Sequence, residues 1–131
     1  PDDYSWVKFK LNPKAKWHDG QPITVEDVIW SFNVLKKQSP LYNKYYGDVE
    51  SAEKTGDHEV KFNFSQKGNR ELPQIMGQLA VLPQPWWEGK DAQGTQRDIS
   101  RPTLEIPLGS SAYKIDSVAP GRSINWARVE D

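Results

Sequence analysis

The segment between Thr24 and Pro40 limits the possible folds most, because it carries signals for one amphipathic helix and for both of its ends. Apolar side chains recur along it at helical spacing and would share one face (Val25, Val28, Ile29, Phe32, Leu35). Thr24 is expected to cap the helix, since its hydroxyl can accept from the amide of Asp27 while the Asp27 carboxylate reaches back. Pro40 disfavours helical geometry in the residue before it. The sequence therefore predicts a helix over residues 25–37.

Alternating apolar and polar residues predict strands before and after this helix. Val7, Phe9 and Leu11 alternate with lysines, which is typical of a half-buried strand. Two later pairs of strand-like segments are each joined by a turn, so both pairs are predicted to be hairpins. The segments are 48–54 with 59–65, joined at Thr55-Gly56-Asp57, and 112–118 with 123–129, joined at Pro120-Gly121.

A second helix and a long loop lie between the two hairpins. Apolar residues at helical spacing indicate a helix over about residues 70–79, capped by Asn69 or Ser65, with Pro73 tolerated only in its first turn. Residues 83–107 are polar and rich in proline, so they are predicted to form a long loop with a helical turn near Trp86. A loop of this length in a small domain usually has a function or contacts another part of the protein.

The order of these elements predicts an α+β fold in which antiparallel β-hairpins pack with two helices. A chain of 131 residues suits a single domain with one core. The sequence opens at Pro1 without an initiator methionine and stops at Asp131 directly after a strand-like run. We therefore expect residues 1–131 to be a single domain that is a fragment of a larger protein.

Composition argues against several classes of function. The chain has 17 basic and 18 acidic residues, and a net charge of -1 argues against a nucleic-acid partner, which usually meets a basic face. With 0 cysteines, neither a disulfide scaffold nor thiol catalysis is possible. No apolar run approaches the ~18–20 residues of a transmembrane helix.

The chain has 2 histidines, His18 and His58, and neither indicates a metal or catalytic site. A zinc site usually needs three or four ligands, so no metal and no cofactor is expected. His58 lies in a predicted hairpin turn, where exposure to solvent is ordinary. His18 with Asp19 leaves two interpretations open, which are acid–base catalysis and a turn in which Asp19 and Gly20 set the backbone. Because the turn accounts for these residues, no catalytic residue is assigned.

Aromatic residues in predicted loops are the stronger functional signal. Tyr42, Tyr45 and Tyr46 follow the first predicted helix, and Trp86 and Trp87 lie in the long loop. Aromatic residues in loops often form recognition surfaces, although they can also belong to the core. Besides a binding protein, two functions stay open here: an aromatic-rich carbohydrate-binding module that uses the two tryptophans, and an enzyme with a histidine base.

The stretch WHDGQPITVEDVIWSF, from Trp17 to Phe32, resembles the signature of the family 5 extracellular solute-binding proteins, the periplasmic peptide-binding components of ABC importers. The family pattern has Trp-His-Asp-Gly, then Pro, an aliphatic residue and Thr, then Asp-Val and an aromatic residue followed by Ser. The matching positions are Trp17, His18, Asp19, Gly20, Pro22, Ile23, Thr24, Asp27, Val28, Trp30 and Ser31.

Later segments agree with this resemblance. Leu82-Pro83 is similar to the leucine-proline pair that precedes the family's connecting loop. Residues 107–115 resemble its Pro-x-Gly-[Thr/Ser]-Gly-Pro-Tyr run, but Ser111-Ala112 stands where Gly-Pro is usual. The runs 86–91, 97–100 and 121–124 resemble the oligopeptide and microcin-uptake branch most.

The resemblance implies part of the first lobe of a two-lobed periplasmic binding protein of type II, which closes on an extended peptide and then docks on a permease. It implies a monomer without enzymatic activity or cofactor, in the periplasm or anchored outside the membrane of a Gram-positive cell. The implied partners are a peptide ligand and an ABC permease in the inner membrane. By position, Tyr42, Tyr45 and Tyr46 are the expected ligand contacts, while His18 and Asp19 are structural.

Overall fold

The computed structural model describes residues 1–130, and its contacts fall into two compact units. The first unit comprises Pro1–Pro13 and Thr24–Leu82, and the second comprises Lys14–Ile23 and Pro83–Asp131. In the described part of the chain, no helix is both long and apolar enough to cross a membrane. The expectation that residues 1–131 form a single domain, as a fragment of a larger protein, stays a prediction.

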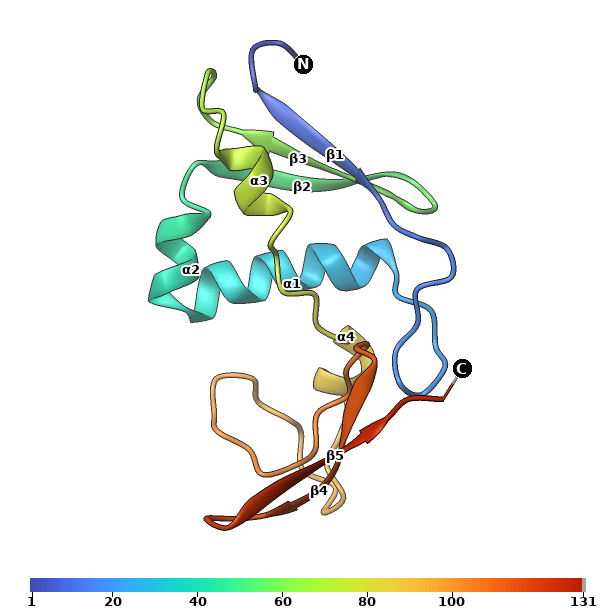
Figure 1. The fold of residues 1–131 in the computed structure, drawn as a ribbon. Helices are drawn as coiled ribbons and strands as arrows, with labels where there is room; N and C mark the ends of the chain where they lie inside the picture. Colours follow the sequence, from blue (N-terminus) through green and yellow to red (C-terminus); the bar gives the residue numbers. More distant parts are fainter. Residues whose placement is uncertain (131) are drawn as a thin grey trace. The chain divides into compact units, whose positions relative to one another are not determined.

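A three-stranded antiparallel sheet with the strand order β1-β3-β2 forms one layer of the first unit (Figure 1). Its strands are β1 (Trp6–Lys10), β2 (Val49–Gly56) and β3 (Glu59–Phe64). Alternate residues of the central strand β3 are buried, which confirms its predicted period of two (Val60, Phe62, Phe64). The predicted hairpin β2–β3 is confirmed, and exposed His58 lies in its turn.

Helix α1 (Val25–Gln38) lies across one face of this sheet and confirms the predicted helix (Figure 1). Thr24 Oγ1 accepts from the Asp27 amide at 3.1 Å, and Asp27 Oδ2 accepts from the Thr24 amide at 2.9 Å. These two bonds are the predicted capping box, and they satisfy amides that the helix itself leaves free. On the buried face, Phe32 of α1 meets Phe62 of β3 edge to face, with 5.6 Å between ring centroids.

Helix α2 (Pro40–Tyr45) is not predicted by the sequence pattern. Ser39 ends α1 and also caps α2, because its side chain accepts from the Tyr42 amide at 3.4 Å. Pro40 then fits the first helical turn, where an amide donor is not needed. The expectation that the three tyrosines lie in a loop is therefore wrong, because they lie on α2 and at its C-terminal end.

Helix α3 (Leu72–Met76) is shorter than the predicted span of 70–79. Glu71, rather than Asn69 or Ser65, precedes it, and the chain leaves the helix at Gly77. Pro73 lies in the first turn, as predicted. Leu72 and Met76 reach the core of the first unit, whose other buried members come from α1, the end of α2 and the sheet (Val25, Val28, Phe32, Tyr46, Val49, Val60, Phe62, Phe64).

The second unit contains a separate two-stranded sheet and a short helix. Strands β4 (Tyr113–Ala119) and β5 (Ser123–Arg128) pair antiparallel, which confirms the second predicted hairpin. Gly121 has a φ of 73°, so the turn between them uses left-handed backbone that glycine adopts without strain. Helix α4 (Gln84–Trp87) is the helical turn expected near Trp86. The α+β prediction with antiparallel hairpins is confirmed, although α2 and α4 extend the predicted pair of helices.

Candidate functional site

The three candidate ligand-binding tyrosines of the first unit have different surroundings. Tyr46 is buried, with 2% of its surface exposed, and its ring lies 5.8 Å from that of Phe32. Tyr42 is half-buried and stacks on Tyr46, with centroids 5.6 Å apart and an interplanar angle of 17°. Tyr45 is 54% exposed. The three side chains thus form a graded series from the core to the solvent, and their ligand role stays a prediction.

Burial also changes the acidity of this cluster. The pKa of Tyr46 is raised above its ordinary value, first because burial penalises the phenolate and second because Tyr42 lies beside it. The Tyr46 hydroxyl therefore stays protonated at neutral pH and can act as a hydrogen-bond donor. Because Tyr46 is buried, the part of this cluster open to solvent comes from Tyr45 and the half-buried Tyr42.

In the second unit, the Trp-His-Asp-Gly segment forms a tight turn. The Trp17 amide donates to Gln21 O at 2.8 Å, and the Gly20 amide donates to Trp17 O at 2.9 Å. Gly20 has a φ of 85°, and Asp19 Oδ1 accepts from the Gln21 amide at 3.0 Å. Both features are those of a turn whose aspartate bonds its own backbone. The geometry agrees with the structural interpretation of Asp19 and Gly20.

His18 joins this turn to the segment that precedes β4. Its amide donates to Gly109 O at 2.8 Å, and its imidazole Nε2 lies 2.9 Å from Ser111 O, in position to donate. A Cβ on Gly109 would lie 3.0 Å from His18 Cε1, so a larger residue could not stand there without a shift. The Trp-His-Asp-Gly turn and residues 107–115, which both carry the family resemblance, therefore meet at His18. The His18 ring holds the backbone of the second segment in place.

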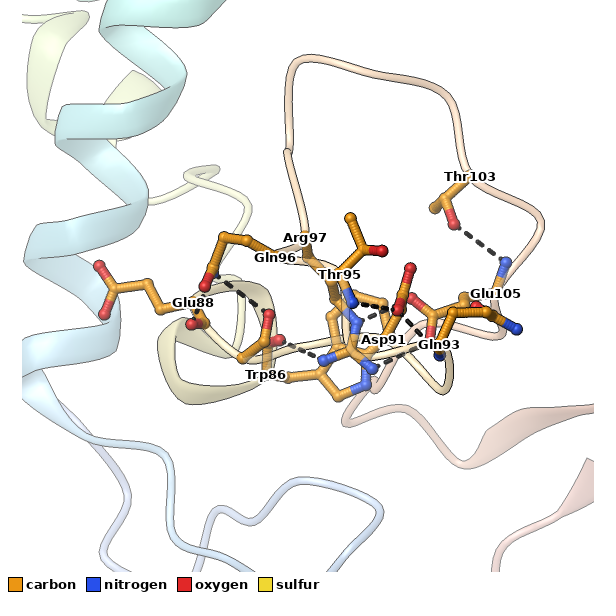
Figure 2. A network of polar contacts seen from close by, with 10 residues as sticks. Trp86, Glu88, Asp91, Gln93, Thr95, Gln96, Arg97, Thr103 and Glu105 are labelled. Atoms are coloured by element: carbon orange, nitrogen blue, oxygen red, sulfur yellow. Dashed lines mark hydrogen bonds and ion pairs between the residues drawn. The ribbon is translucent and has the colours of Figure 1, made fainter.

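Arg97 organises the long loop by binding three groups at once (Figure 2). Its Nη1 donates to Trp86 O at 2.8 Å, and its Cζ lies 4.1 Å from the centroid of the Trp86 ring. Its Nε and Nη2 donate to the two carboxylate oxygens of Glu105 at 2.7 and 2.9 Å. This bidentate pairing needs the planar fork of arginine. One side chain thus connects α4 with the end of the loop.

The ion pair between Arg97 and Glu105 is partly shielded from solvent, and its hydrogen bonds shift the pKa of both groups. Only 15% of the Arg97 side chain and 30% of the Glu105 side chain are exposed, so solvent screens this ion pair less than an open one. Hydrogen bonding to Arg97 lowers the pKa of Glu105, and the same bonds raise the pKa of Arg97. Both groups are therefore charged throughout the neutral range.

Further bonds make the long loop an ordered structure (Figure 2). Asp91 Oδ1 accepts from the amides of Gln93 and Thr95 at 2.9 and 2.8 Å. Gln96 Nε2 donates to Glu88 O at 2.7 Å. The roles of Arg97 and Glu105 are not visible in the sequence, since neither residue lies on a periodic face. Other charged residues of the same loop, such as Lys90, Asp91 and Asp98, give no signal that would single out this pair.

Trp86 and Trp87 do not offer a flat platform for sugars. Their rings meet at 85° with centroids 4.8 Å apart, so they are perpendicular rather than side by side. Arg97 covers one face of Trp86. Stacking on a sugar ring needs an open aromatic face, and this geometry does not provide two of them in one plane. The carbohydrate-binding alternative is therefore not supported.

A shallow pocket of about 240 Å³ lies in the second unit beside the His18 turn. It is open to solvent and mixes a few polar groups with apolar ones (His18, Asp19, Trp86, Ile106, Pro107, Leu108, Lys114, Ile115). Within residues 1–130, no group of three or more His, Asp or Glu side chains is placed to hold a metal ion. The lining thus places an imidazole, a carboxylate and an ammonium group around apolar walls.

Comparisons with known proteins agree on one family. The model of the bacterial extracellular solute-binding proteins, family 5 Middle, matches residues 1–131. The chain is 51% identical to the protein y4wM of Sinorhizobium fredii, and 49% identical to the probable peptide-binding protein YejA of Agrobacterium fabrum. Both matches cover 100% of this chain but only 20% and 21% of the relatives. The chain thus spans about a fifth of the length of these curated relatives.

A solved structure supports the same assignment. The periplasmic oligopeptide-binding protein of an ABC transporter from Thermotoga maritima is 26% identical and superposes with a TM-score of 0.69. The match covers 88% of this chain and 21% of that protein. Together with the family match over all 131 residues, this likeness leaves one assignment. The chain belongs to the bacterial extracellular solute-binding proteins of family 5.

Proposed function

We propose that residues 1–131 are part of a two-lobed periplasmic protein that captures oligopeptides for import by an ABC transporter. The observation that carries the proposal is the 49% identity, over the whole chain, to a relative named as a probable peptide-binding protein. The likeness to the oligopeptide-binding protein of Thermotoga maritima gives independent support. The proposal also makes residues 1–131 a single domain within the first lobe of that longer protein.

In this proposal the protein binds and releases its ligand without covalent chemistry. An extended peptide lies between two lobes, and binding shifts the equilibrium from an open to a closed form. The closed form docks on a permease in the inner membrane. The protein acts as a monomer outside the cytoplasm, without nucleic acid, cofactor or enzymatic activity, and His18 serves the scaffold through its bonds to Gly109 and Ser111.

Tyr42, Tyr45 and Tyr46 are the proposed ligand-side residues. Tyr45 is suited to direct contact, because more than half of its surface is exposed. Tyr42 and Tyr46 stack on each other and hold the end of α2 against the core, which fixes the backbone that carries Tyr45. A rigid aromatic side chain brings much contact area at little cost in conformational entropy.

The proposal is tested on the full-length protein with a mixed oligopeptide library, followed by mass spectrometry of the retained peptides and calorimetry on the best one. We expect saturable binding of peptides by the folded protein. Tyr45→Ala should weaken this binding by roughly ten-fold, as for an exposed aromatic anchor, while Tyr45→Phe keeps it. A folded protein that retains no peptide would overturn the function. Unchanged binding by Tyr45→Ala would overturn only the assignment of this residue.

A further inference from the structure

The hairpin β4–β5 carries its large apolar side chains on one face. Residues paired across two antiparallel strands share a face, and successive residues alternate between faces. A bulge between Ile115 and Ser117 shifts this alternation by one residue, so Val118 returns to the face of Ile115. The apolar face thus consists of the pairs Ile115–Trp126 and Val118–Ile124 together with Tyr113, whose partner Arg128 lies at the end of the same face.

The opposite face of the hairpin carries small and polar side chains together with Lys114, whose partner is Ala127. It carries Ser117 and Asn125, whose side chains are joined by a hydrogen bond of 3.0 Å from Asn125 Nδ2 to Ser117 Oγ. Ala119 and Ser123 form the next pair on this face. One side of the hairpin is therefore suited to water, whereas the other is suited to burial.

Within the described residues this apolar face is open at three of its five apolar positions, while Ile115 and Val118 are half-buried. Tyr113 is 54% exposed, Ile124 55% and Trp126 61%. A two-stranded hairpin is marginally stable in water and usually needs a further layer on its apolar face. An exposed cluster of large apolar side chains of this kind marks a surface that is covered in the functional molecule.

We propose that the apolar face of β4–β5 is the surface on which polypeptide outside residues 1–131 of the same protein packs. The inference rests on the proposed function, in which this chain is part of a longer protein. Its relatives extend far enough to supply such a layer, because the matched region is only 20–21% of their length. The occupant is an apolar face of a helix or sheet from that remainder.

The size of the face argues against a second copy of the protein. Strands of six or seven residues, at about 3.3 Å per residue and about 4.8 Å between strands, give a projected area of roughly 200 Å², and even twice this value in accessible surface would be small for an interface between two proteins. A stable interface between two proteins buries about 800 Å² on each partner. A segment of the same polypeptide has no translational freedom to lose, so a small apolar face is enough to hold it.

The shape of the face argues against a peptide ligand as the occupant. Ligand sites are concave and combine apolar walls with a few convergent polar groups. The apolar face of β4–β5 is one side of a two-stranded ribbon, and its central pairs bring only aliphatic and aromatic side chains (Ile115, Trp126, Val118, Ile124). Arg128, paired with Tyr113, lies at one end of this face, so the centre of the face offers no convergent polar groups that would orient a peptide.

A pair of cysteine variants of the full-length protein tests the inference. Ile124→Cys reports on the apolar face, and Ser123→Cys is an isosteric control at the neighbouring position on the polar face. Residues 1–131 contain 0 cysteines, and labelling by a maleimide is followed by mass spectrometry on the peptide that carries the variant. We expect Cys at position 124 to react at least roughly ten-fold more slowly than Cys at position 123 in the native protein, and equally fast in urea.

Equal labelling of both variants in the folded protein would overturn the inference. Protection that disappears on dilution would instead assign the face to a second copy, and protection that appears only with peptide would assign it to the ligand; either outcome also overturns it. Hydroxyl-radical footprinting of Trp126 in the unaltered protein gives the same test without a variant. The inference is judged on labelling measured without ligand, so a failure of peptide binding leaves that result unchanged, and a second measurement with peptide serves only to detect protection by the ligand.

Discussion

The imidazole Nε2 of His18 lies 2.9 Å from the carbonyl oxygen of Ser111, a residue 93 positions further along the chain. The His18 amide also donates to Gly109 O, so backbone and side chain bind the same short segment. A histidine used in this way holds two loops together and has one ring nitrogen occupied by the backbone. The residue that looks most like a catalyst in the sequence is thus explained by the packing of the turn.

Gly109→Ala should loosen this junction by about 1–3 kcal/mol, the usual cost of overfilling a packed site. The added Cβ would lie 3.0 Å from His18 Cε1, and the neighbouring imidazole is held by its bond to Ser111. Hydrogen exchange of the His18 amide in the full-length protein measures the change. Gly109→Ala combined with His18→Ala should cost less than the sum of the single variants, because the ring is gone. Additive effects would contradict the close contact.

Arg97→Lys should free the long loop, because lysine cannot pair with both oxygens of Glu105 while also stacking on Trp86. We expect chymotrypsin to cleave after the exposed Leu104 roughly ten-fold faster, as for a lost charge-assisted network. Arg101→Lys is the matched control. Arg101 pairs with Asp98, but 82% of the Arg101 side chain is exposed, so this ion pair is expected to contribute little. Equal cleavage of both variants would show that the Arg97 network does not hold the loop.

The same loop should loosen in mild acid. The pKa of Glu105 is lowered in the folded protein by its bonds to Arg97, so the unfolded state takes up the proton first as the pH falls. This contribution to stability is complete well above the ordinary pKa of 4.5 and is lost as the pH falls through 4.5 to the lower folded value. Chymotrypsin is poorly active in acid, so pepsin cleavage of the loop between about pH 5 and 3 gives the measurement. Because pepsin itself becomes more active as the pH falls, the rate is compared with that of Glu105→Gln at each pH, and the two rates should approach each other toward about pH 3.

Thr24→Ala should destabilise the beginning of α1 by about 0.5–2 kcal/mol, because the Asp27 amide loses its acceptor. The buried Asp27 carboxylate would also lose the bond from the Thr24 hydroxyl at 3.0 Å. Hydrogen exchange of the Asp27 amide reports the change directly. Thr24→Ser keeps the hydroxyl and should behave nearly as the unaltered protein, whereas equal losses in both variants would mean that the methyl group matters more than the cap.

The sequence predicts those elements that depend on contacts between residues close together in the chain. Thr24 and Asp27 lie three residues apart, so their mutual cap is visible in the sequence and is present in the structure. The hairpin turn at Gly121 is visible for the same reason. Helix α2 also has a local signal, which is Ser39 as a cap followed by Pro40 in the first turn. The same two residues also end the preceding helix, so the pattern alone predicts the stop and not the new start.

The contacts that shape the candidate site could not be predicted in the same way. Arg97 finds Glu105 and Trp86 only after the loop has closed, and no periodic pattern links the three positions. Tyr42, Tyr45 and Tyr46 look alike in the sequence, yet burial separates them, because only Tyr46 reaches Phe32 in the core. Which aromatic residues face the solvent is decided by tertiary packing and not by composition.

The strand order β1-β3-β2 also determines the order in which the strands can pair during synthesis of the chain. Strand β1 emerges first, but its only neighbour in the sheet is β3, which follows α1, α2 and β2. Hairpin β2–β3 closes a short loop, whereas pairing of β1 must close a loop that contains two helices. Within the described residues, the pairing of β1 with β3 must therefore wait until Phe64 has left the ribosome, and β1 is the last of the three strands to join this sheet.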